Sequence, residues 1–222
     1  MNIAIFGNGK MGKRISQLAI ERGHKIIAVS SSKNPATKIN LTSVDVAIDF
    51  SIPKTAFENI CYAINNGVPI VSGTTAWLNK LQEAKDLCVQ KKGAFLYAEN
   101  FSIGVNLFSQ INKKLARLMK NYNYKNKIHE IHHIQKLDSP SGTAITLAKE
   151  IEENMLKKTT ITSERIKDFP GTHIITYSSE CDEIEIKHTA KNRDGFAKGA
   201  IIASEWIIGK KGNFCINDIL IE

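Results

Sequence analysis

The sequence lacks the features that mark membrane and secreted proteins. Among its 222 residues, no apolar run approaches the roughly 20 residues that a membrane-spanning helix needs. The apolar stretch near the N-terminus runs only from Ile3 to Phe6 and stops at Gly7, so it does not have the layout of a signal peptide. We therefore expect a cytoplasmic globular protein with no membrane partner, built as one large domain or two modest ones.

Cysteine is scarce, and its spacing argues against two kinds of site. The four cysteines include no CxxC pair. Scattered spacing of this kind suits neither a zinc site nor a disulfide framework. We expect the thiols to be reduced and mostly buried, as packing residues. They belong to Cys61, Cys88, Cys181 and Cys215.

The chain has less acidic than basic charge. It carries 30 lysines and arginines against 22 acidic residues, which gives a net charge of +8. Such a balance is compatible with nucleic acid, an anionic surface or small polyanionic ligands. The lysines are spread along the whole chain, however, and no basic run is interleaved with aromatic residues. We therefore predict no nucleic-acid partner, and salt-sensitive retention on DNA would reverse that prediction.

Strand and helix patterns alternate through the first hundred residues. Short apolar strands are each followed by a stretch with helical spacing of its apolar residues, the last of which is expected over 76–91. Buried strands that alternate with helices predict an α/β domain with a parallel sheet covered by helices. The expected strands are 3–6, 26–29, 44–50, 68–71 and 94–97.

The pattern changes near residue 100 and predicts a second domain of the α+β class. We expect this domain, residues 101–194, to contain a mixed or antiparallel sheet. The first domain is expected over residues 1–100, and the last helix and tail, about 195–222, are expected to return to it. In the second domain the expected helices cover about 103–120 and 142–157, and the expected strands cover 128–134, 172–179 and 183–190.

A glycine-rich turn follows the first expected strand. The string Gly7-Asn8-Gly9-Lys10-Met11-Gly12 matches G-x-G-x-x-G and opens the first expected helix. Glycines make the turn tight and let the backbone approach a pyrophosphate, which the N–H groups of the helix start then bind. The string predicts that the first domain is a Rossmann-type domain for a dinucleotide cofactor. A glycine-rich turn without a ligand is the alternative.

The second expected strand ends without the acidic residue that usually binds the adenine ribose. Ser30, Ser31, Ser32 and Lys33 stand there instead. No carboxylate would repel a 2′-phosphate, and three hydroxyls with a cation are suited to hold one. We therefore expect Ser31 and Ser32 to bind the cofactor, with NADPH favoured over NADH. A polar loop without this role is the alternative, and a strong NADH preference in KM values would refute the expectation.

Two adjacent histidines, His132 and His133, lie on an expected strand just before a turn rich in capping residues. Adjacent side chains on a strand point to opposite faces, so this pair is poorly placed to chelate one ion. With no carboxylate or cysteine at ligand spacing, we expect no metal site. One imidazole is suited to proton transfer and its neighbour to binding an anion, while Lys136 adds a cation and a proton donor. Solvent-exposed histidines beside a capped helix are the alternative.

The turn after these histidines leads into the first residues of the next expected helix. Ser141-Gly142-Thr143 opens the expected helix, so its N–H groups and the Thr143 hydroxyl predict a carboxylate-binding site. A small dicarboxylate substrate fits a site that combines these donors with imidazole and ammonium groups.

The string from Glu130 to Thr143, E-x-H-H-x-x-K-x-D-x-P-S-G-T, resembles the signature of the dihydrodipicolinate reductase family. Further pieces of that family appear in the same order, and the resemblance covers nearly the whole chain. These pieces are Asp49-Phe50-Ser51, Gly73-Thr74-Thr75, Asn100 to Asn106, and Arg193 to Ala200.

The resemblance implies an NADH- or NADPH-dependent reduction of 4-hydroxy-tetrahydrodipicolinate to tetrahydrodipicolinate, with loss of water, in lysine and diaminopimelate biosynthesis. It implies that His132 is the acid/base group and Lys136 the proton donor. It also implies that His133, Gly142 and Thr143 bind the substrate carboxylate region. The implied cofactor contacts, besides the glycine turn from Gly7 to Gly12, are Gly73, Thr74, Thr75, Ala98, Glu99, Asn100 and Phe101.

Three departures from the family pattern stand out. The family turn G-x-x-G-R-M-G is one residue shorter here, with Lys10 in place of arginine, and Ser139 stands where alanine is usual. The segment from Thr159 to Thr189 is short and lacks the extended G-D-x-x-G-E-H piece. Since the family commonly tetramerises through its second domain, a homotetramer is implied, with an interface that differs here. A different dehydrogenase of amino or oxo dicarboxylates is the alternative enzyme, and a dinucleotide-binding regulator without chemistry is the alternative of another class.

Overall fold

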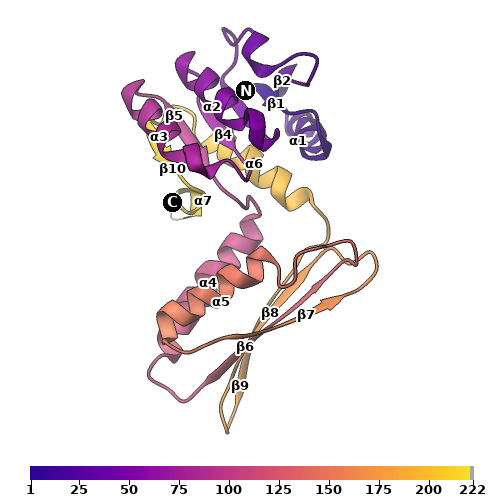
Figure 1. Cartoon of the computed structure of the whole chain (residues 1–222), viewed down its shortest axis with the longest axis vertical. Coiled ribbons are helices and arrows are strands. Elements are labelled where there is room, and N and C mark those ends of the chain that lie inside the picture. The colour runs from indigo at the N-terminus through magenta and orange to yellow at the C-terminus, as the bar shows by residue number, and fades with distance from the viewer. Residues whose placement is uncertain (221–222) are drawn as a thin grey trace. The chain divides into compact units, whose positions relative to one another are not determined.

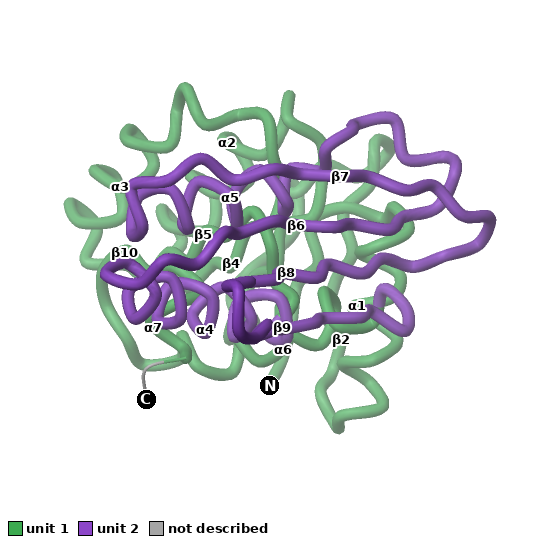
Figure 2. The backbone as a smooth tube through the Cα atoms, turned by 90° about the horizontal axis from the view of Figure 1, so that it is seen from below, with its two compact units in different colours: residues 1–102, 194–222 green, residues 103–193 purple. Residues whose placement is uncertain are grey.

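The chain folds into two compact units, shown in the computed structural model, which describes residues 1–220. Unit 1 contains Met1–Ser102 and the chain from Asp194 onward, and unit 2 contains Ile103–Arg193. Figure 2 colours the two units separately, and Figure 1 labels their elements in chain order. The end of the range expected to return to the first domain, residues 221–222, lies outside the described residues.

Unit 1 is built on a six-stranded sheet in which every neighbouring pair is parallel, in the order β10-β5-β4-β3-β1-β2. The predicted parallel α/β sheet is thus confirmed. The strand order reverses between β1 and β3, and in such sheets ligands bind beside the carboxyl ends of the strands at this point. The strands are β1 (Asn2–Phe6), β2 (Lys25–Val29), β3 (Val46–Asp49), β4 (Ile70–Ser72), β5 (Ala94–Tyr97) and β10 (Gly212–Phe214).

Helices cover both faces of this sheet, because the strands direct apolar side chains to both faces and both must be buried. Ala4 and Phe6 pack with α2 and α3, while Ile3 and Ile5 are also fully buried and face the other way. On that second side α1 packs against α6, and Arg14 donates to both carboxylate oxygens of Asp194 at 2.6 and 2.7 Å. The helices are α1 (Lys10–Glu21), α2 (Pro53–Asn65), α3 (Leu81–Gln90), α6 (Asp194–Trp206) and α7 (Ile216–Leu220), with short 3₁₀ turns at Ala36–Lys38 and Leu78–Lys80.

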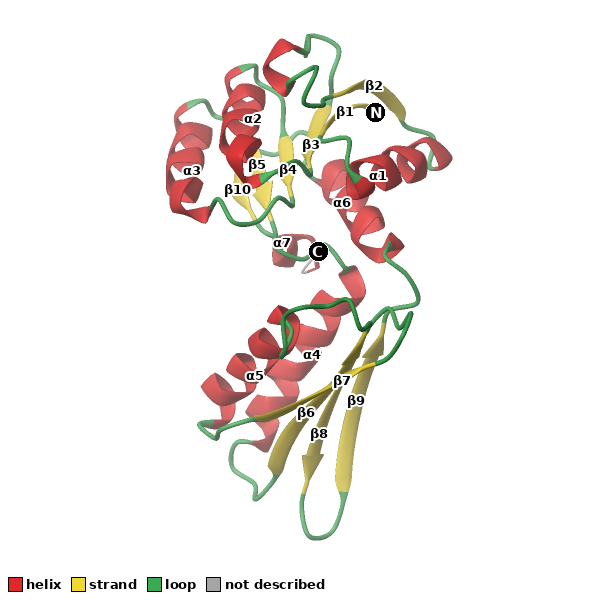
Figure 3. Cartoon of the chain, turned by 45° about the vertical axis from the view of Figure 1, so that its right-hand side comes forward, coloured by secondary structure: helices red, strands yellow, loops and turns green. Residues whose placement is uncertain are grey.

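Unit 2 is a four-stranded sheet with two long helices on one face (Figure 3). The strand order is β7-β6-β8-β9, with β6 parallel to β7 and the other neighbours antiparallel, so the predicted mixed sheet is confirmed. Its core joins the helices to the sheet through residues such as Ile128, Leu147 and Tyr177. The elements are α4 (Ile103–Met119), β6 (Lys125–His132), α5 (Gly142–Met155), β7 (Thr160–Arg165), β8 (Thr172–Ser178) and β9 (Glu183–Thr189).

Several local expectations differ from the structure. The strand expected at 128–134 begins earlier and ends at His132, and the helix expected over 76–91 is a 3₁₀ turn followed by α3. The thiols were expected to be mostly buried, but Cys181 and Cys215 are exposed. Among the described residues, no helix combines the length and the apolar character that a membrane span requires.

Candidate active site

The glycine turn of unit 1 connects β1 to α1 with very close backbone packing. Gly7 has φ +116°, and a Cβ on it would collide with the Phe50 backbone; a Cβ on Gly12 would collide with the Gly7 carbonyl. Around Gly9, in contrast, a Cβ would meet nothing within 4 Å. The first turn of α1 carries no acidic residue, and no side chain caps its N–H groups. This helix start therefore has the room and the free donors that an anionic group needs.

The turn lines a cavity of about 340 Å³ together with the loops after β3 and β4. Gly73 admits the Phe50 ring, since a Cβ there would collide with it. The structure thus brings the predicted Gly9-Lys10-Met11 and Gly73-Thr74-Thr75 pieces to one place, and it adds three residues to which sequence reasoning gave no cofactor role. All nine lining residues are Gly9, Lys10, Met11, Phe50, Ser51, Pro53, Gly73, Thr74 and Thr75.

A buried carboxylate, Asp49, ties the two loops of this cavity together at the end of β3. It is fully buried, and its Oδ1 accepts hydrogen bonds from Ser51 Oγ at 2.7 Å and Asn59 Nδ2 at 2.9 Å. Its Oδ2 accepts from Thr74 Oγ1 at 2.7 Å and Ser72 Oγ at 2.9 Å. Burial raises the pKa of Asp49, and these neutral donors only partly offset that rise.

The three serines after β2 differ in burial, from the buried Ser30 to the exposed Ser32. Ser30 is buried, and its Oγ accepts the Gly7 N–H at 3.0 Å, so it holds the glycine turn. Ser31 Oγ accepts the Asn34 N–H at 3.2 Å. Ser32 and Lys33 are exposed. The expectation of three hydroxyls available for a 2′-phosphate is therefore wrong for Ser30, which is buried in the fold.

The segment after β5 lies outside the residues that line the cavity. Ala98 and Phe101 are buried, and the Phe101 ring lies 5.6 Å from the Phe50 ring. Glu99 is exposed, and Asn100 Oδ1 accepts the Ser102 N–H at 2.8 Å. These four predicted contacts are therefore not brought to the cavity by the fold of unit 1 alone.

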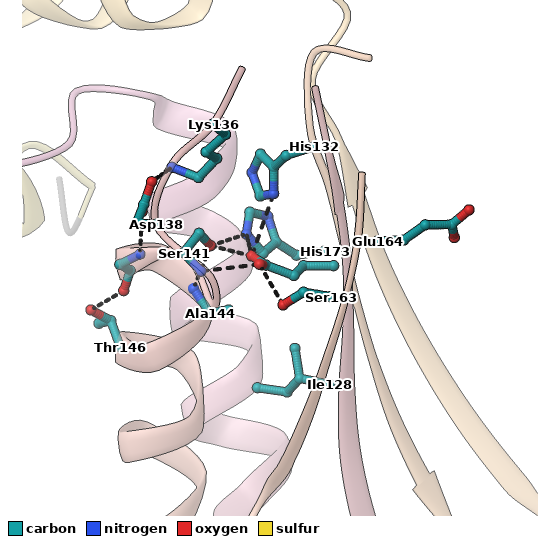
Figure 4. Close-up of polar contacts among 12 residues, drawn as sticks. Ile128, His132, Lys136, Asp138, Ser141, Ala144, Thr146, Ser163, Glu164 and His173 are labelled. Atoms are coloured by element: carbon teal, nitrogen blue, oxygen red, sulfur yellow. Dashed lines mark hydrogen bonds and ion pairs between the residues drawn. The ribbon is translucent and has the colours of Figure 1, made fainter. Parts of the chain in front are cut away.

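In unit 2 the strand β6 ends between the two predicted histidines, so the expectation that both lie on the strand is wrong for His133. Ile128, Glu130 and His132 are buried at alternate positions of β6, on the face that the helices cover. His133 follows the end of the strand and is half-buried, and its Nδ1 is buried without a hydrogen-bond partner among the described residues. Figure 4 shows His132 pointing from the sheet toward the loop that carries Lys136.

Glu130 is the centre of a buried polar cluster that draws on four elements. Its Oε1 accepts from Ser141 N at 3.0 Å and Ser163 Oγ at 2.8 Å, and Arg165 lies 3.4 Å away. Its Oε2 accepts from Ser141 Oγ and lies 3.4 Å from His132 Nδ1 and 3.6 Å from His173 Nε2. Ser163, Arg165 and His173 were missed by sequence reasoning, as they stand outside the motif.

The pKa values of Glu130, His132 and His173 are all lowered, which favours a charged carboxylate and neutral imidazoles. Burial alone would raise the pKa of Glu130, but hydrogen bonds from Ser141 and Ser163 and the neighbouring His132 outweigh it, and the pKa is lowered. Burial lowers the pKa of His132 against the pull of Glu130, and burial beside His132 lowers the pKa of His173 to about 4. Both imidazoles are thus neutral and the carboxylate is charged near neutral pH.

The loop between β6 and α5 holds the remaining predicted groups. Lys136 Nζ lies 2.9 Å from Asp138 Oδ1, and Asp138 Oδ2 accepts the Gly142 N–H over a long 3.4 Å. Ser141 caps α5, since its Oγ accepts the Ala144 N–H at 3.2 Å. Thr143 is half-buried in the first turn. At this helix start the Gly142 N–H therefore meets only a distant oxygen of the protein's own Asp138, and the carboxylate site stays a prediction.

Ligand atoms of Glu130, His132 and His173 lie within 4.8 Å of one another, a spacing that a metal ion can bridge. Sequence reasoning considered only the adjacent histidines and overlooked Glu130, two residues away on the same face. The positive charges of Lys136 and Arg165 act on His132 as well, and Glu130 already accepts several hydrogen bonds. This surrounding charge favours a hydrogen-bonded cluster over a cation site.

Comparison with known proteins places both units in one family. Models described as dihydrodipicolinate reductase, N-terminus, and dihydrodipicolinate reductase, C-terminus, match residues 1–101 and 104–220. The chain belongs to the dihydrodipicolinate reductase family. The resemblance drawn from the sequence motifs is thereby confirmed.

Individual members of the dihydrodipicolinate reductase family match over nearly the full length. The 4-hydroxy-tetrahydrodipicolinate reductase of Christiangramia forsetii is 46% identical over 99% of this chain and 98% of its own. That of Methanosarcina acetivorans is 32% identical over 98% of this chain and 88% of its own. The dipicolinate-bound dihydrodipicolinate reductase from Paenisporosarcina shares the fold with a TM-score of 0.79 at 25% identity, covering 97% of each chain. An aspartate dehydrogenase from Thermotoga maritima, 14% identical with a TM-score of 0.51 and coverage of 95% and 97%, shares the fold only.

Proposed function

We propose that this chain is an oxidoreductase that reduces 4-hydroxy-tetrahydrodipicolinate to tetrahydrodipicolinate with a nicotinamide cofactor, in lysine and diaminopimelate biosynthesis. The observation that carries the proposal is the arrangement in unit 2, where His132, Lys136 and the open start of α5 belong to one strand, loop and helix. The 46% identity to a reductase of that name over 99% of the chain supports the same reaction.

Unit 1 is proposed as the cofactor domain, residues 1–102 with the chain after Asp194. Three features support the fit of a dinucleotide. The backbone packs too closely at Gly7 and Gly12 for any side chain, the space around Gly9 is open, and no side chain caps the start of α1. When bound, the cofactor supplies the hydride. We assign its binding to the predicted residues of the glycine turn, of Gly73 to Thr75 and of Ala98 to Phe101.

NADPH is the proposed preferred cofactor. No carboxylate stands at the end of β2, Ser32 and Lys33 are exposed there, and Lys10 lines the cavity at the start of α1. These groups favour a 2′-phosphate. Ser31 stays assigned to cofactor binding through its side chain, which is partly buried. The ratio of kcat/KM for NADPH and NADH tests this, and a ratio well below one would contradict it.

The substrate carboxylates are proposed to bind His133, Gly142 and Thr143. Ser141 satisfies the Ala144 N–H with its own hydroxyl, and the Gly142 N–H has only the distant Asp138 oxygen, so a substrate carboxylate is able to replace Asp138. The unpartnered Nδ1 of His133 supplies a further polar contact.

Proton transfer is proposed for His132 and Lys136. Loss of water from the substrate leaves a conjugated imine, and addition of hydride at C4 moves electron density away from that carbon, so a proton must follow. Lys136, ion-paired with Asp138, is the proposed acid. The lowered pKa of His132 means that its imidazole starts neutral and is able to accept a proton, and a bound dianion would draw its pKa upward.

We propose that the chain forms a homotetramer through contacts of unit 2. We also propose that it works in the cytoplasm and has no nucleic-acid partner. Exposed apolar side chains along α4, at Leu107, Ile111 and Leu118, support self-association. Light scattering after gel filtration checks this, and a monomeric mass at assay concentration would contradict it.

The reaction is tested by following the absorbance of the reduced nicotinamide while the preceding synthase supplies the unstable substrate in the cuvette. We expect turnover that depends on the synthase. Aspartate and its oxo acid are assayed as substrates of the alternative dehydrogenase. Turnover of either compound without turnover of the synthase product would refute the proposal.

A further inference from the structure

Glu130 is the one acidic group that acts on His132 in this part of unit 2, among the described residues. It is fully buried, and an unpaired buried carboxylate would be very costly. Instead it receives hydrogen bonds from Ser141, the N-cap of α5, and from Ser163 of β7, and two imidazoles lie near its second oxygen. A carboxylate in such a position controls the groups around it through hydrogen bonds and charge.

The two ring nitrogens of His132 have different surroundings. Nδ1 is buried without a hydrogen-bond partner, and the Glu130 Oε2 lies 3.4 Å from it. Nε2 lies beside Gly171, where even a Cβ would approach to 3.2 Å, so the missing side chain keeps that side of the ring uncrowded. Only Nε2 is then placed to reach a ligand. Hydrogen bonds of this kind are often long in ligand-free proteins and shorten in the complex.

The same carboxylate also holds the start of α5. Ser141 donates to it through both its N–H and its hydroxyl, and the residues that follow, Gly142 and Thr143, are the proposed carboxylate site. One buried group therefore connects the imidazole of β6 with the anion-binding turn of α5.

We propose that Glu130 is the positioning residue of this site: it accepts the Nδ1 proton of His132, which leaves Nε2 as the atom that exchanges a proton, and it fixes the start of α5 at the same time. The catalytic consequence rests on the proposed function, whereas the tautomer of His132 does not. Carboxylates that orient a histidine through its second nitrogen play this part in other enzymes.

Glu130 also sets the charge balance around His132. The other groups that act on the ring are cations or imidazoles, so loss of the Glu130 charge leaves His132 harder to protonate. The groups that face it or its neighbour His173 are Glu130, His133, Lys136, Arg165, His173 and His188.

The test compares Glu130→Gln with Glu164→Gln, the same change at an exposed carboxyl on β7. With ¹⁵N-labelled histidine, two-bond ¹H–¹⁵N spectra of the ligand-free protein report the tautomer of each ring, and His132→Gln assigns the signal. We expect the Nδ1–H tautomer of His132 in the wild type and in Glu164→Gln, and a changed tautomer in Glu130→Gln. If Glu130→Gln fails to fold, the wild-type spectrum is sufficient, because an Nε2–H tautomer of His132 in the wild type overturns the proposal.

Kinetics give the second readout. Removing such an orienting partner should lower kcat by about 10- to 100-fold and move the acidic limb of the pH profile to lower pH, while Glu164→Gln stays within about twofold. An unchanged pH profile in Glu130→Gln overturns the proposal, as does a His132 signal that shifts when EDTA is added, since Nδ1 would then bind a metal ion. The expected tautomer in a protein that does not turn over the synthase product would instead refute the proposed function alone.

Discussion

Each unit contains one fully buried carboxyl at or near the end of a strand, and the two behave in opposite ways. Asp49 of β3 is surrounded by neutral hydroxyl and amide donors, and its pKa is raised. Glu130 of β6 is surrounded by serines, imidazoles and Arg165, and its pKa is lowered. The neutral donors of Asp49 anchor two loops, whereas the partners of Glu130 include a guanidinium group and two imidazoles. The comparison predicts that the unit 1 carboxyl serves binding and the unit 2 carboxyl serves chemistry.

The largest effect is expected at the ammonium group of unit 2. Lys136→Ala should lower kcat by at least about 100-fold, because the proposed proton donor is lost. Steady-state assays with saturating cofactor measure this. Lys127→Ala, an exposed lysine on β6, is the matched control and should change kcat little. Near-normal turnover of Lys136→Ala would remove Lys136 from the mechanism.

Asp49→Asn tests the binding side of the comparison. An amide nitrogen in place of one oxygen leaves two donors without an acceptor, so the loops at Ser51 and Thr74 lose their common anchor. We expect the Kd for NADPH to rise about tenfold, measured by titration of cofactor fluorescence. Asp45→Asn, just before the opposite end of β3, should bind NADPH normally. Equal affinities in both variants would contradict the role of Asp49.

The two carboxyls should also give opposite pH dependences of stability. Asp49 has a raised pKa, so its contribution to the free energy of unfolding is present below its usual pKa of 3.8 and is lost as pH rises through the folded value. Glu130 has a lowered pKa, so its contribution is present above its usual 4.5 and is lost as pH falls through the folded value. Urea unfolding of wild type, Asp49→Asn and Glu130→Gln across acidic to neutral pH measures both differences. Slopes of the same sign would break the comparison.

His133→Ala should raise the substrate KM by about tenfold with a smaller change in kcat, because its imidazole is assigned to binding. His129→Ala, a partly exposed histidine of β6 that pairs with Glu164, provides the control. An unchanged KM in His133→Ala would count against the assignment.

The smallest effect concerns cofactor choice at the end of β2. Lys33→Ala should raise the KM for NADPH by about threefold and leave that for NADH unchanged, since an exposed charge contributes modestly. Lys25→Ala, at the other end of β2 and also exposed, is the control. Equal changes for both cofactors would show that Lys33 does not contact the 2′-phosphate.

Local patterns predicted most of the fold. The parallel sheet of unit 1 and the glycine turn were predictable, because short apolar strands and the G-x-G-x-x-G string are local signals that span only a few residues. The burial of alternate residues of β6 up to His132 followed from strand geometry, whereas the end of the strand before His133 was not predicted. Strand β7 was missed, because this edge strand is mostly exposed and polar, without the apolar alternation that marks a strand.

The cluster around Glu130 was not predictable, for a different reason. His173 lies opposite Glu130 only through the register of β8 against β6, and Ser163 pairs with Glu130 through the register of β7. Register depends on the packing of the whole sheet rather than on a local pattern. The spacing of Glu130 and His132, two apart on one strand, was the one signal that sequence reasoning had available and did not use.

The proposed hydride transfer from the nicotinamide cofactor to the substrate can be followed with an isotope label. With nicotinamide cofactor deuterated at the transferred position and substrate supplied by the preceding synthase, mass spectrometry and NMR of the product report where deuterium arrives. We expect one deuterium at C4 of tetrahydrodipicolinate with wild-type protein, and strongly reduced labelling with Lys136→Ala. Product without deuterium, or cofactor that is never consumed by the wild-type protein, would contradict it.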